Sequence, residues 1–454
     1  MFHKTRVLSF CLICFSLLLA ACGGGSAGST SSTELSMWTW KEAHIPGLEA
    51  IAADFKAQTG ITVNVNAYTP DVAYRTKITT AAQTGNLPDI ISYWSGSQYD
   101  LAASGVLSDI TGKVDASWQS EFSPGTYTKT SVYTQQKYTT CQKDPKCTYK
   151  NVQVGKVYSI PYVAGQSYYI YANKAILQKA GLATNAAPSN AEQWLSMMET
   201  VKRKTGTPGV VTGVQNPGPL DLWLYRPMLM TSCGVSTYDA IFNGKDSFTN
   251  PCSMRVLNWI DQISQNKLWM PGILQTDIDP ADQAFSEGKA AFDIGGTYTL
   301  SFLLQQGMKA SDIMTFPVPA LQGSVYPQLK VGVNALIDAG ITANSPHQKE
   351  ALQFLKFMTQ ATEMEKFAKT VGDLPAVKIS DDPSKVGNVL PGLLKGLSNN
   401  SPFNQSQAQA QTDPQNVLEV GLQQFITGEI TPAKLAHKLD ISNAAAWKAA
   451  GGPQ

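Results

Sequence analysis

The sequence predicts an α/β protein with two domains, and three observations lead to this fold class. Segments with the two-residue period of a strand alternate with segments that have the spacing of an amphipathic helix. Strands that alternate with helices are typically joined by right-handed crossovers into a parallel sheet. The chain has 454 residues, which is more than one hydrophobic core usually fills.

The elements that open the folded part of the chain follow the order strand, helix, strand, helix, strand. Each expected helix ends at a glycine, Gly60 or Gly85. The expected elements are a strand at 35–40, a helix at 47–60, a strand at 61–68, a helix at 72–85 and a strand at 88–94. Trp40 and Trp94 therefore stand at the carboxyl ends of two strands, the edge at which parallel sheets bind ligands.

The alternating pattern is interrupted at 118–152, a stretch rich in Thr, Tyr, Lys and Gln that we interpret as a surface excursion. Strand and helix patterns then resume, apart from a polar stretch at 396–413 that is typical of a loop. The elements expected after the excursion are a strand-to-helix unit at 157–182, a helix at 189–204 that starts from a Ser189 cap, a helix–turn–strand unit at 281–298, a helix at 345–369 and two terminal helices at 414–427 and 431–447.

The N-terminus has the pattern of an export signal. Lys4 and Arg6 precede 15 apolar or small residues, a segment too short for a normal membrane span. Residues 1–21 are therefore predicted to be a signal peptide, and residues 22–32 a flexible tether. The residues LAAC, which end at Cys22, resemble a bacterial lipobox, and this implies acylation of Cys22 and a lipid anchor. The alternative is ordinary signal cleavage that leaves Cys22 free.

The charge balance does not favour a strongly charged partner. The chain has 35 Lys and Arg against 34 Asp and Glu, and removal of Lys4 and Arg6 with the signal would leave a net charge near −1. No basic excess points to nucleic acid or to anionic lipid. Membrane contact is therefore expected only through the lipid anchor, and no nucleic-acid partner is expected.

Four cysteines lie beyond the N-terminal segment: Cys141, Cys147, Cys233 and Cys252. Four cysteines allow three pairings. Proximity favours Cys141–Cys147 and Cys233–Cys252 as disulfides, in keeping with an oxidising compartment. A zinc site is the alternative, but these cysteines form no C-x-x-C pair and no histidine lies near them in the sequence.

Nine short motifs follow one another along nearly the whole mature chain: LAAC, MWTWKEA, FKAQTGITV, GNLPDIISYW, LAASGVLSDI, IPYVAGQSYYIYANKAIL, AFSEGKAAFDIGGTY, KEALQFLKFMT and GDLP. Each motif alone is weak, but the ordered set is specific. The chain resembles the extracellular solute-binding proteins of bacterial ABC importers, in the sugar-binding group that includes maltose-binding protein.

The resemblance implies a two-lobed periplasmic-binding-protein fold of type II, the Venus-flytrap fold, with a hinge between the lobes. The N-terminal lobe would comprise 33–163 and 337–382, and the C-terminal lobe 164–336 and 383–454. A carbohydrate bound in the cleft would favour the closed form, which would deliver it to the membrane permease subunits of an ABC transporter. The protein would act as a monomer without a cofactor or metal, lipid-anchored at the outer face of the bacterial cytoplasmic membrane or in the periplasm.

The resemblance also carries ligand contacts onto positions of this sequence. Glu42 stands for a sugar-contacting acid, Tyr74 for a hydroxyl-contacting side chain and Tyr298 for a stacking aromatic. Aromatic rings stack on the apolar face of a pyranose, while carboxylates and amides bind its hydroxyls. The predicted ligand-binding residues are Trp40, Glu42, Tyr74, Trp94, Gln166, Trp223 and Tyr298.

Some features depart from the family's pattern or have another interpretation. Residues 95–97 replace a family acid with Ser-Gly-Ser, Trp40 replaces a polar residue of the maltose-type members, and the 118–152 excursion is longer than usual. Burial in a core is the alternative for Trp40, Trp94 and Trp223. The acidic residues Asp277, Asp279 and Asp282 lack the spacing of a calcium loop and are expected to cap the start of a helix.

Two other functions are weighed against sugar binding. The same fold could bind a polyamine, an iron chelate or a phosphate ester, but the sequence shows neither a strongly acidic set of site residues nor a phosphate cradle. A lipid-anchored glycosidase would also display aromatics and carboxylates. The family resemblance favours a binding protein that is not an enzyme.

Overall fold

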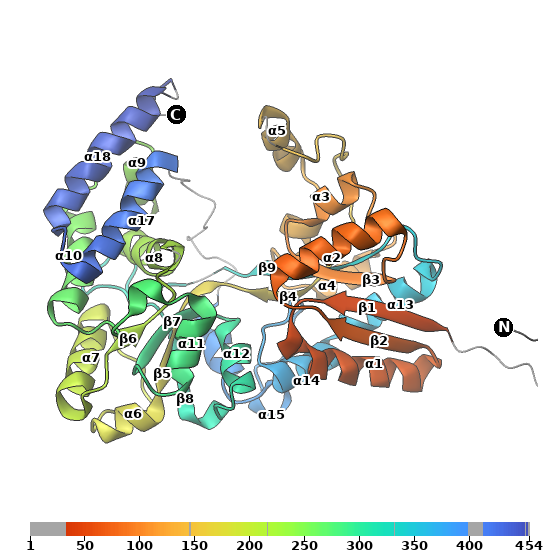
Figure 1. Ribbon diagram of the computed structural model, residues 1–454, viewed down its shortest axis with the longest axis horizontal. Helices are drawn as coiled ribbons and strands as arrows, with labels where there is room; N and C mark the ends of the chain where they lie inside the picture. Colours follow the sequence, from red (N-terminus) through yellow and green to blue (C-terminus); the bar gives the residue numbers. More distant parts are fainter. Residues whose placement is uncertain are drawn as a thin grey trace, which may run out of the picture.

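The structure is a computed structural model that describes residues 33–144, 147–215, 217–330, 332–397, 412–449 and 451–452. The predicted signal peptide, the tether with Cys22 and most of the polar stretch at 396–413 lie outside the described residues. Two sheets, each covered by helices, stand side by side and are joined by extended segments of the chain (Figure 1).

The first sheet has five strands in the order β2-β1-β3-β9-β4. β1 (Glu34–Thr39) lies between β2 (Thr62–Ala67) and β3 (Ile90–Trp94) and pairs with both in parallel. β9 (Asn334–Ile341) is antiparallel to β3 and to β4 (Ile160–Gly165). The parallel arrangement of the first three strands is therefore confirmed, and a strand from late in the chain closes the sheet against β4.

The second sheet has four strands in the order β6-β7-β5-β8. β5 (Ser167–Asn173) is antiparallel to both β7 (Phe292–Gly296) and β8 (Ile313–Pro317). The two-residue strand β6 (Val210–Val211) pairs with β7 in parallel. Every residue of β7 is buried, so this strand forms the centre of the second lobe.

The helices surround these sheets, and the first helix shows how the sequence specifies them. Leu48, Ile51 and Phe55 of α1 (Ile45–Thr59) are buried on one face, and Gly60 ends the helix with φ 77°, a conformation that favours glycine. The other helices near the first sheet are α2 (Asp71–Thr84), α3 (Gln98–Ala103), α4 (Ala116–Glu121), α5 (Gln135–Lys143), α13 (Gln348–Met358) and α14 (Ala361–Val371), with the short helices η1 (Glu42–His44) and η2 (Tyr127–Ser131).

The helices of the second lobe surround a separate core. The larger cluster of buried apolar residues contains β5 and β7, whereas β1, β3 and α1 belong to another cluster. The helices outside the first group are α6 (Lys174–Lys179), η3 (Leu220–Tyr225), α7 (Ala191–Thr205), α8 (Arg226–Cys233), α9 (Val235–Phe242), α10 (Pro251–Gln265), η4 (Ile273–Gln275), α11 (Ile278–Ser286), α12 (Thr299–Gln305), η5 (Ala310–Asp312), α15 (Pro383–Val386), α16 (Leu390–Gly396), α17 (Thr412–Thr427) and α18 (Pro432–Ala449).

Two expectations about helix ends are wrong in detail. The expected helix at 345–369 is two helices, α13 and α14, because Gln360 between them has extended backbone, with ψ 143°. The cap of α7 is Asn190 rather than Ser189: the Asn190 side chain accepts a hydrogen bond from the backbone N–H of Gln193, at 2.8 Å. In both cases the local backbone geometry, which periodicity does not reveal, sets the boundary.

The chain crosses between the two lobes more than once. β4 leads directly into β5 through Gln166, and β9 returns to the first sheet after β8. A third segment follows α14, where Leu374 accepts a hydrogen bond from the backbone N–H of Ala164 at 2.8 Å. These crossings agree with the two-lobed fold class, which is confirmed.

The expected excursion at 118–152 carries α4, η2 and α5. It rises beside α3 on the first lobe (Figure 1). A small apolar cluster packs the excursion against α3: it contains Tyr99 of α3, Tyr133 and Val152, with the flanking rings of Tyr138 and Tyr149. The excursion is therefore a packed appendage of the first lobe.

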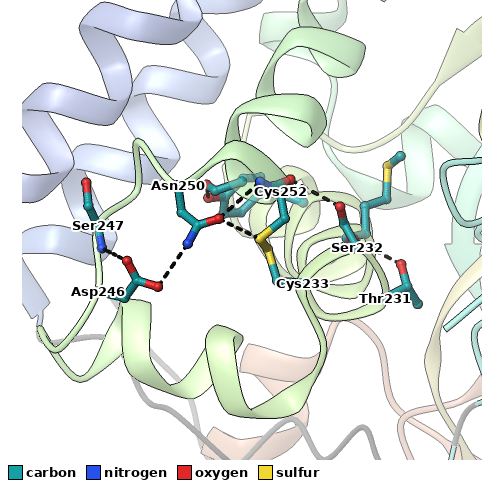
Figure 2. Close-up of a disulfide and its surroundings, with 10 residues drawn as sticks. Thr231, Ser232, Cys233, Asp246, Ser247, Asn250 and Cys252 are labelled. Atoms are coloured by element: carbon teal, nitrogen blue, oxygen red, sulfur yellow. Dashed lines mark hydrogen bonds between the residues drawn. A yellow bond between two sulfur atoms is a disulfide. The ribbon is translucent and has the colours of Figure 1, made fainter. Parts of the chain in front are cut away.

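Both disulfides favoured by the sequence are present. Cys141–Cys147 joins the end of α5 to the following loop, with Cα atoms 5.3 Å apart. Cys233–Cys252 joins the end of α8 to the start of α10, with Cα atoms 5.2 Å apart. In Figure 2 the Asn250 side chain caps α10 by accepting from the Cys252 N–H at 3.1 Å. With all four sulfurs in disulfides, these cysteines do not form the alternative zinc site.

Removal of the second disulfide is expected to cost more than removal of the first. The Cys233–Cys252 bridge closes a loop with a sequence separation of 19, against 6 for Cys141–Cys147, and the entropic gain grows with loop length. We expect Cys233→Ser with Cys252→Ser to lower the free energy of unfolding by about 3 kcal/mol and the other double variant by about 2 kcal/mol. Denaturant unfolding of both variants measures this; equal losses would contradict the loop-length argument.

Candidate functional site

An aromatic group stands at the carboxyl edge of the first sheet. Trp40 follows β1 and Trp94 ends β3, and because these strands are parallel neighbours the two rings meet, with centroids 5.1 Å apart. Trp40 is 6% exposed and Trp94 is 38% exposed. Trp94 is therefore the ring of this pair that is accessible to a ligand, and Trp40 packs against it.

Tyr74 also contacts Trp40 and stacks on it, with 6.1 Å between the ring centroids. Its hydroxyl is directed toward the carbonyl oxygens of Trp38, at 3.0 Å, and Ser92, at 2.8 Å. Burial raises the pKa of Tyr74 well above its usual value. The predicted contact between this hydroxyl and a ligand stays a prediction, and the geometry favours a supporting role.

The second lobe presents its own aromatic pair. Trp223, in η3, is 8% exposed, and its ring meets the edge of Tyr298 with centroids 5.9 Å apart. Tyr298 follows β7, and a Cβ atom added at Gly296 would lie 2.3 Å from its Cε1 atom. The Tyr298 ring therefore rests directly on the Gly296 backbone, a close approach that requires glycine.

Gln166 lies where the first lobe passes into the second. Its carbonyl accepts from the Thr297 N–H at 2.8 Å, and its own N–H donates to the Thr297 hydroxyl at 3.3 Å. A Cβ added at Gly165 would lie only 1.9 Å from that hydroxyl. These contacts place Tyr298, the next residue after Thr297, beside the crossing between the lobes.

The predicted acid Glu42 is exposed at the start of η1, three residues after the end of β1. The element η1 contacts α12 of the second lobe. Trp40 and Glu42 lie at one edge of the first lobe, and Tyr298 lies at an edge of the second lobe. This contact consequently brings the two edges to the same interlobe region.

A buried histidine fixes η1 to the crossing segment after α14. The Nε2 atom of His44 lies 2.5 Å from an Asp373 carboxylate oxygen, and both side chains are buried. Burial lowers the pKa of His44, against the opposing effect of Asp373. The contact between His44 and Asp373 therefore anchors the short helix that carries Glu42 to this crossing segment.

The sequence did not reveal a pair of buried carboxyl groups behind the second aromatic pair. Asp282 on α11 and Asp293 on β7 are both buried, and neither oxygen of Asp293 has a donor among the described residues. Burial raises the pKa of Asp293 to about 7, and burial together with Asp293 raises the pKa of Asp282 well above its usual value. Two carboxyl groups can hydrogen-bond to each other only when one is protonated.

The sequence predicts that Asp277, Asp279 and Asp282 cap the start of a helix, and one of them does so. Asp277 caps α11 by accepting a hydrogen bond from the Ile278 N–H at 2.9 Å. Asp282 instead points from the buried face of α11. Its burial could have been predicted from the sequence, because Asp282 stands three residues before Phe285 and therefore on the apolar side of the helix.

Two cavities in the described part of the chain lie away from these aromatics. One of about 460 Å³ is lined by Lys202, Trp269 and neighbouring residues of the second lobe. Another of about 330 Å³ lies along the third crossing, between Ser123 and Leu397. A site shared by two lobes is enclosed only when they close, and the assignment of the ligand site to the interlobe region stays a prediction.

Fold and site together define a two-lobed α/β binding protein with an aromatic group on each lobe. A family model for bacterial extracellular solute-binding proteins matches residues 50–388. The chain belongs to this family, and the resemblance noted in its motifs is confirmed.

Similar proteins were found in both sequence and structure. A multiple sugar-binding protein of Streptococcus mutans is 26% identical over 384 residues, which cover 80% of each chain. A structure solved in work on xylan utilization by Caldanaerobius polysaccharolyticus has a TM-score of 0.65 at 19% identity and covers 90% of this chain and 99% of that one. The GacH receptor of Streptomyces glaucescens has a TM-score of 0.59 at 17% identity and covers 92% of this chain and 99% of that one. The structural likenesses show the two-lobed fold.

No helix among the described residues has the length and apolarity needed to cross a membrane.

Proposed function

We propose that this protein is the carbohydrate receptor of an ABC importer and binds a mono- or oligosaccharide between its lobes. The observation that carries the proposal is the placement of aromatic rings on both interlobe edges, Trp40 with Trp94 on one and Trp223 with Tyr298 on the other. Among its relatives, the Streptococcus mutans protein is named for sugar binding and the GacH receptor was solved with acarbose.

The chemistry of these edges suits a neutral polyol. Two aromatic faces can stack on the apolar sides of a sugar ring, each contributing about 0.5–1.5 kcal/mol. Glu42 and Gln166 supply acceptors and a donor for hydroxyl groups. The burial of His44 disfavours its charged form. A charged solute such as a polyamine or phosphate ester is the alternative occupant.

The remaining parts of the proposal follow from membership of the family. The lobes would comprise 33–163 with 337–382, and 164–336 with 383–454, and would close about the crossings as a hinge. The closed form would dock on permease subunits as a monomer. Acylated Cys22 would hold the receptor at the outer face of the membrane. The family is one of binding proteins, and we propose that the chain has no enzymatic activity.

Isothermal titration of residues 23–454 against mono- and oligosaccharides, with a polyamine and inorganic phosphate in the same panel, tests the proposal. We expect saturable one-to-one binding of at least one saccharide, and a large loss of affinity in Trp223→Ala. If the protein binds the polyamine or phosphate and no sugar, the receptor role would stand and the carbohydrate assignment would be overturned. Product formed from a bound oligosaccharide would overturn the absence of enzymatic activity.

A further inference from the structure

The turn that presents Trp94 is held from two sides. On one side it is fixed to β9: the Ser95 N–H donates to the Leu336 carbonyl at 2.9 Å, and the Ser95 hydroxyl donates to the buried Asp338 carboxylate at 2.5 Å. On the other side the Gly96 N–H donates to the Gln98 side-chain oxygen at 2.6 Å. The orientation of this turn therefore depends on Gln98 as well as on the sheet.

Gln98 connects the turn to the excursion. Its side-chain nitrogen donates to the Thr130 carbonyl at 2.8 Å, and Thr130 belongs to η2. The Gln98 side chain has no exposed surface, so water does not compete for these bonds. The buried Gln98 amide thus joins the Gly96 N–H to a backbone carbonyl that lies 32 residues after Gln98 in the chain.

The Thr130 carbonyl is an acceptor shared by three donors. Besides Gln98, it accepts from the Tyr99 hydroxyl at 2.5 Å and from the Lys137 ammonium at 3.0 Å. Lys137 also donates to the Tyr99 hydroxyl at 2.9 Å. Burial lowers the pKa of Lys137 to about 8, so the ammonium remains largely charged at neutral pH and strengthens its hydrogen bonds.

We propose that Gln98 is a positioning residue for ligand binding, through which the 118–152 excursion sets the orientation of the turn that presents Trp94. This inference rests on the proposed carbohydrate function. Gln98 is fully buried and does not reach a ligand itself. Its role explains why a long polar excursion is built around Thr130 and Lys137 beside the binding edge: the excursion supplies the second support of the Trp94 turn.

The first test needs no ligand. It measures the quenching of Trp94 fluorescence by acrylamide in the native chain and in Gln98→Met. The Trp94 signal of each protein is obtained by subtracting the fluorescence of the same protein with Trp94→Phe. Methionine has a similar length but forms neither hydrogen bond. We expect the Trp94 quenching constant to rise about twofold in Gln98→Met and by less in Lys137→Met, which removes one of three donors. Unchanged quenching in Gln98→Met would overturn the proposal.

The second test uses the sugar found by titration. Gln98→Met is expected to weaken its binding about tenfold, the equivalent of one buried hydrogen-bond pair. Lys143→Met, on the exposed side of α5, is the matched control and should change neither quenching nor affinity. The double variant Cys233→Ser with Cys252→Ser destabilises the other lobe and should leave Trp94 quenching unchanged.

The two tests separate this inference from the proposed function. If no sugar binds the native chain, the carbohydrate proposal fails while the quenching comparison still decides whether Gln98 positions Trp94. If a sugar binds the native chain and Gln98→Met alike, the positioning role in binding is overturned. A loss of affinity that matches the disulfide variant's loss would assign the effect to stability alone and would also overturn it.

Discussion

Replacing Asp293 with asparagine is expected to stabilise the protein at pH 8 by several kcal/mol and to have little effect at acid pH. Burial raises the pKa of Asp293 to about 7 from an ordinary value of 3.8. A carboxyl group with a raised pKa in the folded state contributes its stability below the ordinary value and loses it as pH rises through the folded value. The loss therefore extends from about pH 4 to about pH 7, at about 1.4 kcal/mol per pH unit.

An asparagine at this position is neutral at every pH, so it requires no bound proton in the folded state. Its amide can donate to Asp282 at any pH, and it carries no charge into a strand whose residues are all buried. The charges of Asp279 and Lys41 also affect the pKa of Asp282. Burial raises the pKa of Tyr298 and of Tyr171, and both buried acids raise it further. The substitution at Asp293 leaves all of these neighbours in place.

Calorimetric unfolding at pH 5 and pH 8 measures the effect. The difference in melting temperature between Asp293→Asn and the native chain should be several degrees larger at pH 8 than at pH 5. Asp312→Asn is the control, because this exposed side chain lies in η5 of the second lobe and takes no part in the buried pair. A stabilisation of equal size at both pH values would show that the buried pair does not retain its proton on folding.

Much of the fold could be predicted because its signals are local. The spacing of Leu48, Ile51 and Phe55 defines α1, and Gly60 marks its end. The alternation of 35–40 defines β1, so the parallel start of the first sheet follows from strand–helix order. The place of β9 between β3 and β4 was not predictable in this way, because it depends on pairing between Ile90 and Ile341, which are far apart in sequence.

The candidate site was predictable only in outline. Strand polarity places Trp40 and Trp94 at one edge without any structure. It does not show that the Tyr74 hydroxyl is directed toward backbone carbonyls or that Asp282 meets Asp293. Those arrangements depend on the packing of α2 and α11 against their sheets. Sequence periodicity predicts which face of a helix is buried, but it does not identify the side chain that each buried residue contacts.

Trp40→Ala is expected to weaken binding of the identified sugar about thirtyfold. This change corresponds to about 2 kcal/mol, the scale of a tryptophan at the centre of an interface. The Trp40 ring contacts both Tyr74 and Trp94, with centroids 6.1 and 5.1 Å from its own. Without it the exposed Trp94 ring loses the surface on which it rests, so one stacking face is lost even if Trp40 itself contributes little contact. Trp40→Phe should recover most of the affinity.

A control of matched burial separates binding from stability. Trp269 is 7% exposed, against 6% for Trp40, and lies in the second lobe away from the aromatic edges. Truncation of either large buried ring should lower the melting temperature, because both leave a cavity. Only Trp40→Ala should raise the Kd in titration. Equal affinities for Trp40→Ala and Trp269→Ala would place the sugar elsewhere on the protein, because the edge of β1 and β3 would then contribute nothing to recognition.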